Sequence, residues 1–246
     1  MTNLIEPLRR AALYRYLALS FMPPTAKRTD EIIELIPEMD SRLRDEALGL
    51  ASERHVENLE GMYHLVIGAQ KNVRCCETDF LQEAAGNKGA VLGDVAGFYR
   101  AFGFKADAEL REVPDHIAIE LSFLSFLAFK EGFALHRNDE DQVDTCRDAE
   151  AKFIGQHLDR WFHRFSGALA AMTRDGYYCS LALFADSALG NLLSEAREKI
   201  KDSHPFLVGH APGDVLDGEE GCASCFQTHA EPQSADTRCE TDSQTK

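Results

Sequence analysis

The amino-acid sequence predicts an all-α fold, with a single globular helical bundle domain followed by a disordered acidic C-terminal tail. Three observations support this prediction. Apolar residues recur at three- and four-residue intervals along most of the chain, and no segment is best explained as an alternating strand. No proline occurs between Pro114 and Pro205, as expected where several long helices follow one another. The 246 residues also suffice to bury a sizeable core.

The most apolar segment is REVPDHIAIELSFLSFLAFK at 111–130. Its apolar residues alternate in places, but the segment is too long for a strand and also follows helical spacing. A helix that is apolar nearly all round is normally buried by other helices. We therefore expect a central helix whose first turns, carrying Asp115, His116 and Glu120, approach the surface.

Helices are also expected in the N-terminal third. Pro7 suits a first helical turn, and apolar residues at four-residue steps continue to a Met-Pro-Pro stop. Thr29 or Asp30 can cap the next helix. Short connections favour antiparallel pairing of these elements. The expected helices cover 7–21, 30–36, 38–51 and 53–71.

Residues 73–89 break the helical periodicity and form the longest irregular stretch expected within the folded part. Loops on a rigid scaffold often carry function. Helical spacing resumes at Val91, and Gly103 can end that helix. Residues 105–114 form a charged connection to the central helix.

Two turn signals divide the C-terminal half. Arg-Asn-Asp at 137–139 predicts a break after the central helix, and Arg-Asp-Gly at 174–176 predicts a turn. The apolar stripes predict helices over 140–155, 158–172 and 181–200.

The composition changes after Phe206. Residues 209–246 contain eight acidic and two basic residues and few large apolar ones. Such a segment cannot offset the entropy of ordering itself by apolar burial. We expect a helical domain over 1–208 and a flexible, acidic, cysteine-containing tail over 209–246.

The net charge of −15 argues against nucleic acid or an anionic membrane surface as a partner. It would suit a basic peptide, although an acidic excess is also common in soluble cytoplasmic proteins. Seven cysteines, an odd number, in a chain without an evident secretory leader do not predict a disulfide framework. These features predict a cytoplasmic protein.

The N-terminus imitates a twin-arginine export signal, because Arg9-Arg10 precedes a fairly apolar stretch. Arg15 and two tyrosines interrupt that stretch, so an amphipathic first helix is the better interpretation. No segment approaches the roughly 18 to 20 uncharged apolar residues that a membrane span needs.

Nothing in the sequence supports enzymatic activity. No glycine-rich phosphate loop, nucleophile elbow or HExxH motif occurs. His116 and Glu120 are spaced to share a metal or a proton, but no third ligand lies nearby and a simple polar pair explains the spacing. A small helical enzyme using these two residues is the weakest hypothesis.

Cys222 and Cys225 have the spacing that lets two thiolates bind one metal, and His210, His229 and Cys239 could complete the ligands. Unliganded thiols in a mobile segment are the other interpretation. An ordered zinc or iron site would make the chain a metal-binding regulatory or redox protein, which is the alternative function. No other cofactor is expected.

The residues EVPDH at 112–116, followed by ELSFL at 120–124, resemble the E-x-P-D-H-x-x-x-E-L-x-F-L signature of the TorD/DmsD/NarJ family. Tyr99 and Gly103 resemble a second family element, an aromatic residue followed four positions later by glycine. The resemblance extends from about Leu4 to about Phe206. The members of the TorD/DmsD/NarJ family are cytoplasmic chaperones dedicated to complex molybdoenzymes.

The resemblance implies a non-enzymatic chaperone that binds the leader or N-terminal segment of the catalytic subunit of a molybdenum-cofactor oxidoreductase. It would hold that subunit for cofactor insertion, assembly and twin-arginine export. Because the family's Asp-His pair is linked with leader recognition, the resemblance assigns signal-peptide binding to Asp115 and His116, with Glu112, Pro114 and Tyr99 beside them. From spacing alone Asp115 would cap its helix and His116 would lie in the first turn; function can coexist with capping.

The sequence RCCETDF at 74–80 resembles a Cys-rich stretch in the family branch that serves ethylbenzene dehydrogenase and selenate reductase-like enzymes. This chain has Cys76 where that stretch is expected to carry proline.

Helical domains of the family can exchange helices, and residues 105–114 are long enough for a hinge. A monomer and a domain-swapped dimer are both open.

Overall fold

The computed structural model describes residues 4–54, 59–67, 72–81, 87–106, 112–173 and 176–203. These residues form helices and no strand, which confirms the predicted all-α fold. None of their helices is both long and apolar enough to cross a membrane. The predicted tail, with Cys222 and Cys225, lies outside the described residues, so its flexibility and its metal site stay predictions.

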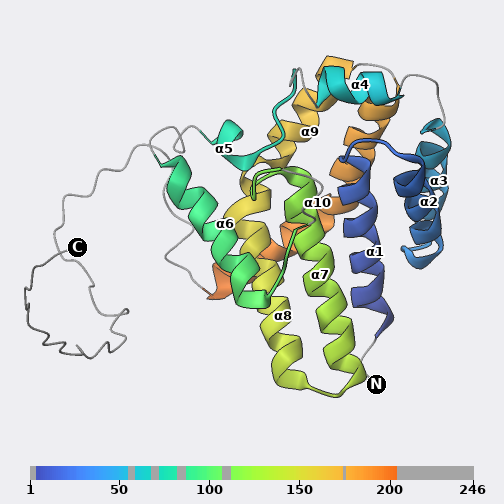
Figure 1. The fold of residues 1–246 in the computed structure, drawn as a ribbon. Helices are drawn as coiled ribbons and strands as arrows, with labels where there is room; N and C mark the ends of the chain where they lie inside the picture. Colours follow the sequence, from blue (N-terminus) through green and yellow to red (C-terminus); the bar gives the residue numbers. More distant parts are fainter. Residues whose placement is uncertain are drawn as a thin grey trace, which may run out of the picture. The chain divides into compact units, whose positions relative to one another are not determined.

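Helix α7 (Ile117–His136) is the predicted central helix. It lies between α1 (Ile5–Ser20) and α8 (Glu140–Phe153), and α8 returns alongside it after a short turn (Figure 1). Most α7 side chains are buried, which agrees with its apolar sequence. Asn138 makes the turn with a φ of 56°, a conformation that asparagine tolerates better than most residues.

The helix that starts with α8 does not break where the sequence suggested. It continues through the π-helical turn η3 (Ile154–Leu158) into α9 (Asp159–Thr173). Such π turns insert an extra residue into a helix and are frequent at functional sites. Helix α10 (Tyr177–Ser203) then packs against α9 after Gly176, whose φ is 96°.

The N-terminal elements differ in detail from the prediction. Helix α2 (Ala26–Leu35) is capped by Thr25, whose hydroxyl accepts the Arg28 N–H at 3.2 Å, so Thr29 and Asp30 are not the cap. The chain then forms the 3-10 turn η1 (Ile36–Glu38) and α3 (Arg44–Glu53). The continuous helix predicted over 53–71 is wrong, because α3 ends at Glu53 and α4 covers only Leu59–Val66.

The predicted irregular stretch contains the short helix α5 (Glu77–Phe80). Helix α6 (Lys88–Phe102) follows, and Gly103 ends it with a φ of 72°, as predicted. Aromatic rings attach α6 to the bundle: the Phe98 ring centroid lies 5.3 Å from that of Phe153 and 6.4 Å from that of Phe123.

The apparent export signal belongs to the core. Ten residues of α1 are buried, and Arg10 binds two carboxylates, Glu131 on α7 and Glu150 on α8. Tyr14 donates its hydroxyl hydrogen to Glu150 at 2.8 Å. Helix α1 is therefore a structural helix of the bundle, as the interrupted apolar stretch indicated.

Candidate functional site

The signature residues lie where an extended segment meets the start of α7. The Ile117 N–H donates to the Cys75 carbonyl at 2.9 Å, and the Glu77 N–H donates to the Asp115 carbonyl at 3.0 Å. Cys76 and His116 thereby form an isolated antiparallel bridge. We call residues 75–78 together with 115–117 the latch, because they connect α5 to α7.

Asp115 is fully buried within the latch. Its Oδ2 accepts the Thr78 N–H at 3.0 Å and the Thr78 hydroxyl at 2.7 Å. Asp115 therefore caps α5, a helix remote in sequence, and not its own helix. The prediction that it reaches a surface rim is wrong, because pairing with residues 75–78 covers it.

His116, and not Asp115, caps α7. Its Nδ1 accepts the Ala118 N–H at 3.2 Å, and its side chain is buried. Because Nδ1 is an acceptor, the ring carries its proton at Nε2. That proton points at Cys75 Sγ, 3.1 Å away. The prediction of an exposed first-turn histidine is wrong.

The Cys75 sulfur is a strong acceptor at this place. A hydrogen bond from Cys76 and a second from His116 lower the pKa of Cys75 to about 5, although burial acts in the opposite direction. The same contact with Cys75, together with burial, raises the pKa of Cys76. These shifts favour the thiolate form at Cys75 and the thiol form at Cys76, and a thiolate is the reactive form of cysteine.

Glu120 does not pair with His116. Its Oε2 accepts the indole N–H of Trp161 at 3.3 Å. Burial, followed by the nearby charge of Glu77, raises the pKa of Glu120 well above its usual range, which favours the neutral form of the side chain. Among the described residues no cluster of three or more His, Cys, Asp or Glu side chains could hold a metal ion.

The π turn brings His157 to the same place. His157 Nδ1 lies 2.9 Å from Glu77 Oε2, and its Nε2 lies 3.3 Å from Asp94 Oδ2 on α6. Neither His157 nor Trp161 was predicted as a site residue, because only the fold brings α9 and η3 against α5. The sequence does single out Cys75, because it is one of two consecutive cysteines, Cys75 and Cys76.

The remaining predicted residues surround the latch. Tyr99 is buried and donates its hydroxyl hydrogen to the Pro114 carbonyl at 2.8 Å. Glu112 and Val113 are exposed, the latter by 43%. The structure therefore assembles the five predicted residues, but it leaves only the 112–114 segment facing solvent.

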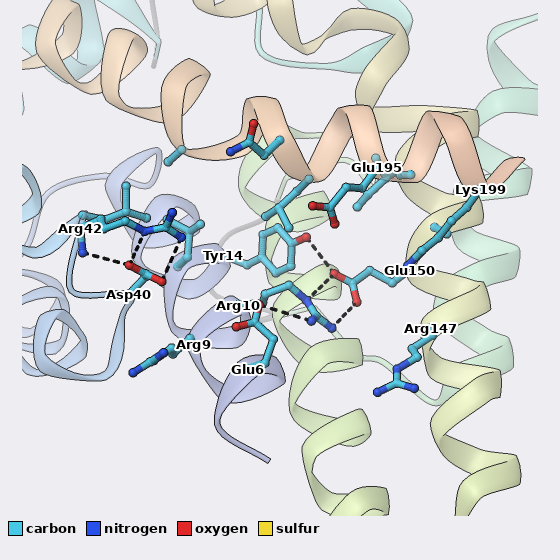
Figure 2. Close-up of a pocket in the computed structure, with 18 residues that line it drawn as sticks. Glu6, Arg9, Arg10, Tyr14, Asp40, Arg42, Arg147, Glu150, Glu195 and Lys199 are labelled. Carbon is cyan, nitrogen blue, oxygen red and sulfur yellow. Dashed lines mark hydrogen bonds and ion pairs between the residues drawn. The ribbon is translucent and has the colours of Figure 1, made fainter. Parts of the chain in front are cut away.

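A second candidate is a pocket of about 250 Å³ among α1, α8, α10 and the segment after η1 (Figure 2). Several of its charged groups bind one another. Arg10 Nε lies 3.2 Å from Glu150 Oε1, and hydrogen bonds from Arg42 lower the pKa of Asp40 to about 2. With both acidic and basic groups in its lining, the pocket favours no class of ligand.

Comparison with known proteins identifies the family. Residues 36–166, slightly more than half of the chain, match the family model described as nitrate reductase delta subunit. No solved structure matches the chain significantly.

Among characterised relatives, the selenate reductase assembly chaperone protein of Thauera selenatis is 30% identical over 117 residues, which cover 48% of this chain and 56% of the relative. The chaperone protein TorD of Vibrio cholerae is 33% identical over 85 residues, 35% of this chain and 37% of TorD. The chlorate reductase assembly chaperone protein of Ideonella dechloratans is 32% identical over 81 residues, 33% of this chain and 41% of the relative.

The chain thus spans roughly half the length or less of these relatives. Their names describe chaperones rather than enzymes, and they include the selenate reductase branch that the RCCETDF sequence resembles. With the family model, the latch residues and the helical fold in agreement, the chain belongs to the nitrate reductase delta subunit family, which includes the TorD/DmsD/NarJ chaperones.

Proposed function

We propose that this protein is a non-enzymatic assembly chaperone for the catalytic subunit of a molybdenum-cofactor oxidoreductase. The observation that carries the proposal is family membership, together with relatives named for the assembly of selenate, chlorate and perchlorate reductases. The client is accordingly a subunit of a large reductase or dehydrogenase.

The chaperone binds the leader or N-terminal segment of that subunit in the cytoplasm. It holds the subunit until the cofactor has been inserted, before assembly and twin-arginine export. Release must follow, so the interface has a moderate apolar area and a charged rim and is not a large permanent one. The net charge of −15 favours a client segment with basic residues, because opposite charges accelerate encounter.

Within this function the latch positions the client-facing surface. Asp115 and His116 are buried and cannot touch a client in this conformation. They fix the segment just before them, in which Glu112 and Val113 are exposed. Glu112 and Val113 contact the client, and Asp115, His116 and Tyr99 act as positioning residues.

The test is affinity capture of the tagged chaperone from its own cells, grown with tungstate in place of molybdate so that unfinished enzyme accumulates. We expect enrichment of one large molybdoenzyme subunit, identified by mass spectrometry. Absence of any such subunit would contradict the proposed function.

Surface and latch variants separate contact from positioning. The Glu112→Arg, Val113→Asp double variant should lose the captured subunit while its thermal unfolding stays unchanged, because both side chains face solvent. The Asp115→Ala variant should lose capture and stability together. Normal capture by the surface variant would exclude residues 112–113 as a client contact.

A further inference from the structure

A groove of about 490 Å³ lies between α6 and α8, and none of the latch residues lines it. Each helix contributes one face, with lining residues three or four positions apart. The lining residues are Asp94, Gly97, Phe98, Ala101 and Phe102 from α6, and Thr145, Asp148, Ala149 and Lys152 from α8.

The groove has an apolar floor that is already fixed in place. The Phe98 ring packs edge-on against Phe153 and His157, with centroid distances of 5.3 and 5.6 Å. A binding surface that is rigid before binding loses little conformational entropy when a partner arrives.

Small residues keep the groove open. A Cβ atom added to Gly97 would meet no atom within 4 Å, and Ala101 and Ala149 line the same hollow. A face of glycine and alanine lets another backbone approach closely. A peptide segment, rather than a bulky rigid ligand, suits such a face.

Two of the three charged residues in the groove lining are acidic. Asp94 has a side chain that is 63% exposed, and Asp148 is exposed and has no ion pair among the described residues. Asp141, also exposed, lies on the same face of α8 as Asp148, seven positions before it. Lys152 is the basic residue in the lining. An anionic occupant would meet like charges, whereas a cationic one would be attracted.

We propose that the α6–α8 groove binds a basic, apolar peptide segment of the client, with a cationic side chain at Asp94 and Asp148 and apolar side chains over Gly97, Ala101 and Phe98. This inference rests on the proposed chaperone function and adds a second client contact to residues 112–114.

The test uses a fluorescein-labelled peptide with two adjacent arginines followed by an apolar stretch, and fluorescence anisotropy of the full-length chaperone. Gly97→Leu fills the groove with a side chain that has room and that favours the helix. We expect its peptide affinity to fall by about ten-fold or more, as for loss of a central contact.

Gly93→Leu is the matched control, since Gly93 lies one turn earlier, is exposed, also has no atom within 4 Å of an added Cβ and does not line the groove. It should bind like the wild type. Equal circular dichroism and thermal unfolding of the two variants would show that both fold.

The charge part of the proposal is tested separately. Asp148→Asn should weaken peptide binding by about three-fold at low salt, as for an exposed charge contact, and the difference should shrink as salt increases. Asp144→Asn removes an exposed acid of α8 outside the groove lining and should change little.

The outcomes distinguish the two proposals. If the wild type binds neither the peptide nor the captured subunit, the chaperone function itself fails. If it binds the subunit but not the peptide, or if Gly97→Leu binds the peptide like the wild type, the groove proposal is overturned and the chaperone function stands. A dimer that Gly97→Leu dissociates, with peptide affinity unchanged, would instead assign the groove to a second copy of the chain.

Discussion

The two ends of α7 carry buried polar clusters of different kinds. Near its C-terminal end lies a network of alternating charges that connects three helices. Its members are Arg10, Tyr14, Glu131, Arg147 and Glu150. At its N-terminal end lie the latch and its neighbours, which include Glu77, Asp115, Glu120, His157 and Trp161.

The clusters differ in how completely their polar atoms are paired. In the described part of the chain, no buried side-chain nitrogen or oxygen of the first network lacks a hydrogen bond. In the second cluster, four residues each have one buried polar atom without a hydrogen bond: Glu77 Oε1, Asp115 Oδ1, Glu120 Oε1 and His157 Nε2. The 3.3 Å contact of His157 with Asp94 therefore lacks hydrogen-bond geometry.

This difference separates two uses of buried polarity. A network with all its members paired fixes the positions of helices relative to one another. An incompletely paired cluster costs desolvation free energy, and each unpaired atom needs a reason. In this chain the second cluster adjoins the exposed 112–114 segment. Under the proposed function, its polarity serves to position that segment rather than to add stability.

The largest effect is expected from breaking the satisfied network. Arg10→Ala leaves buried Glu150 without its cation, and we expect a loss of about 3 kcal/mol in the free energy of unfolding, measured with urea. Arg9→Ala is the control, because Arg9 is the adjacent arginine and has no hydrogen bond or ion pair within the described residues. It should lower the free energy of unfolding far less. Equal losses would mean that the network adds no stability beyond ordinary helix packing.

The latch should respond more moderately. Asp115→Ala removes the acceptor for two Thr78 donors, and we expect a loss of about 2 kcal/mol; Thr78→Val should lose about 1 kcal/mol. Because both changes break the same contact, the double variant should lose less than the sum. Strict additivity in urea unfolding would show that the contact contributes nothing.

A third prediction concerns the thiolate of the latch. The ultraviolet absorbance of the Cys75 thiolate should titrate with a midpoint near pH 5. His116→Asn keeps an N-cap acceptor for α7 but removes the Nε2–H donor, so the midpoint should rise. An unchanged midpoint would mean that His116 does not contribute and that the contact with Cys76 alone lowers the pKa of Cys75.

The same shift gives a pH dependence of stability with a defined sign. The pKa of Cys75 is lower in the folded protein, about 5, than its ordinary value of 9.0. The stability that ionisation contributes is therefore fully present above pH 9.0 and is lost as the pH falls towards about 5. Relative to Cys75→Ala, the wild type should lose free energy of unfolding over that interval. A constant difference would contradict the assignment.

The smallest effect is expected at an exposed pair. Arg42, whose side chain is 85% exposed, binds Asp40, and Arg42→Ala should leave the urea unfolding midpoint unchanged because water screens the pair. The pKa of Asp40 should nevertheless rise from about 2 towards its usual value, as an NMR titration would show. A clear loss of stability in Arg42→Ala would contradict the expected difference between buried and exposed ion pairs.

Particular elements show how far the sequence alone could be interpreted. The periodicity predicted the central helix, and Gly103 predicted the end of α6, because both signals are local. The prediction of one helix over 53–71 was wrong, because the helical spacing of apolar residues continues past the point where α3 ends. The break expected near residue 155 became a π turn, since helical spacing on both sides does not reveal an inserted residue.

The sequence by itself determined the fold class, most of the helices and the family, since these depend on local spacing and on a short signature. Only the tertiary structure decided that Asp115 and His116 are buried. It did so by pairing residues 75–77 with 115–117, a contact between segments some forty positions apart that no local pattern reveals. For the same physical reason, the π turn that carries His157 to Glu77 and the groove between α6 and α8 emerged only from packing.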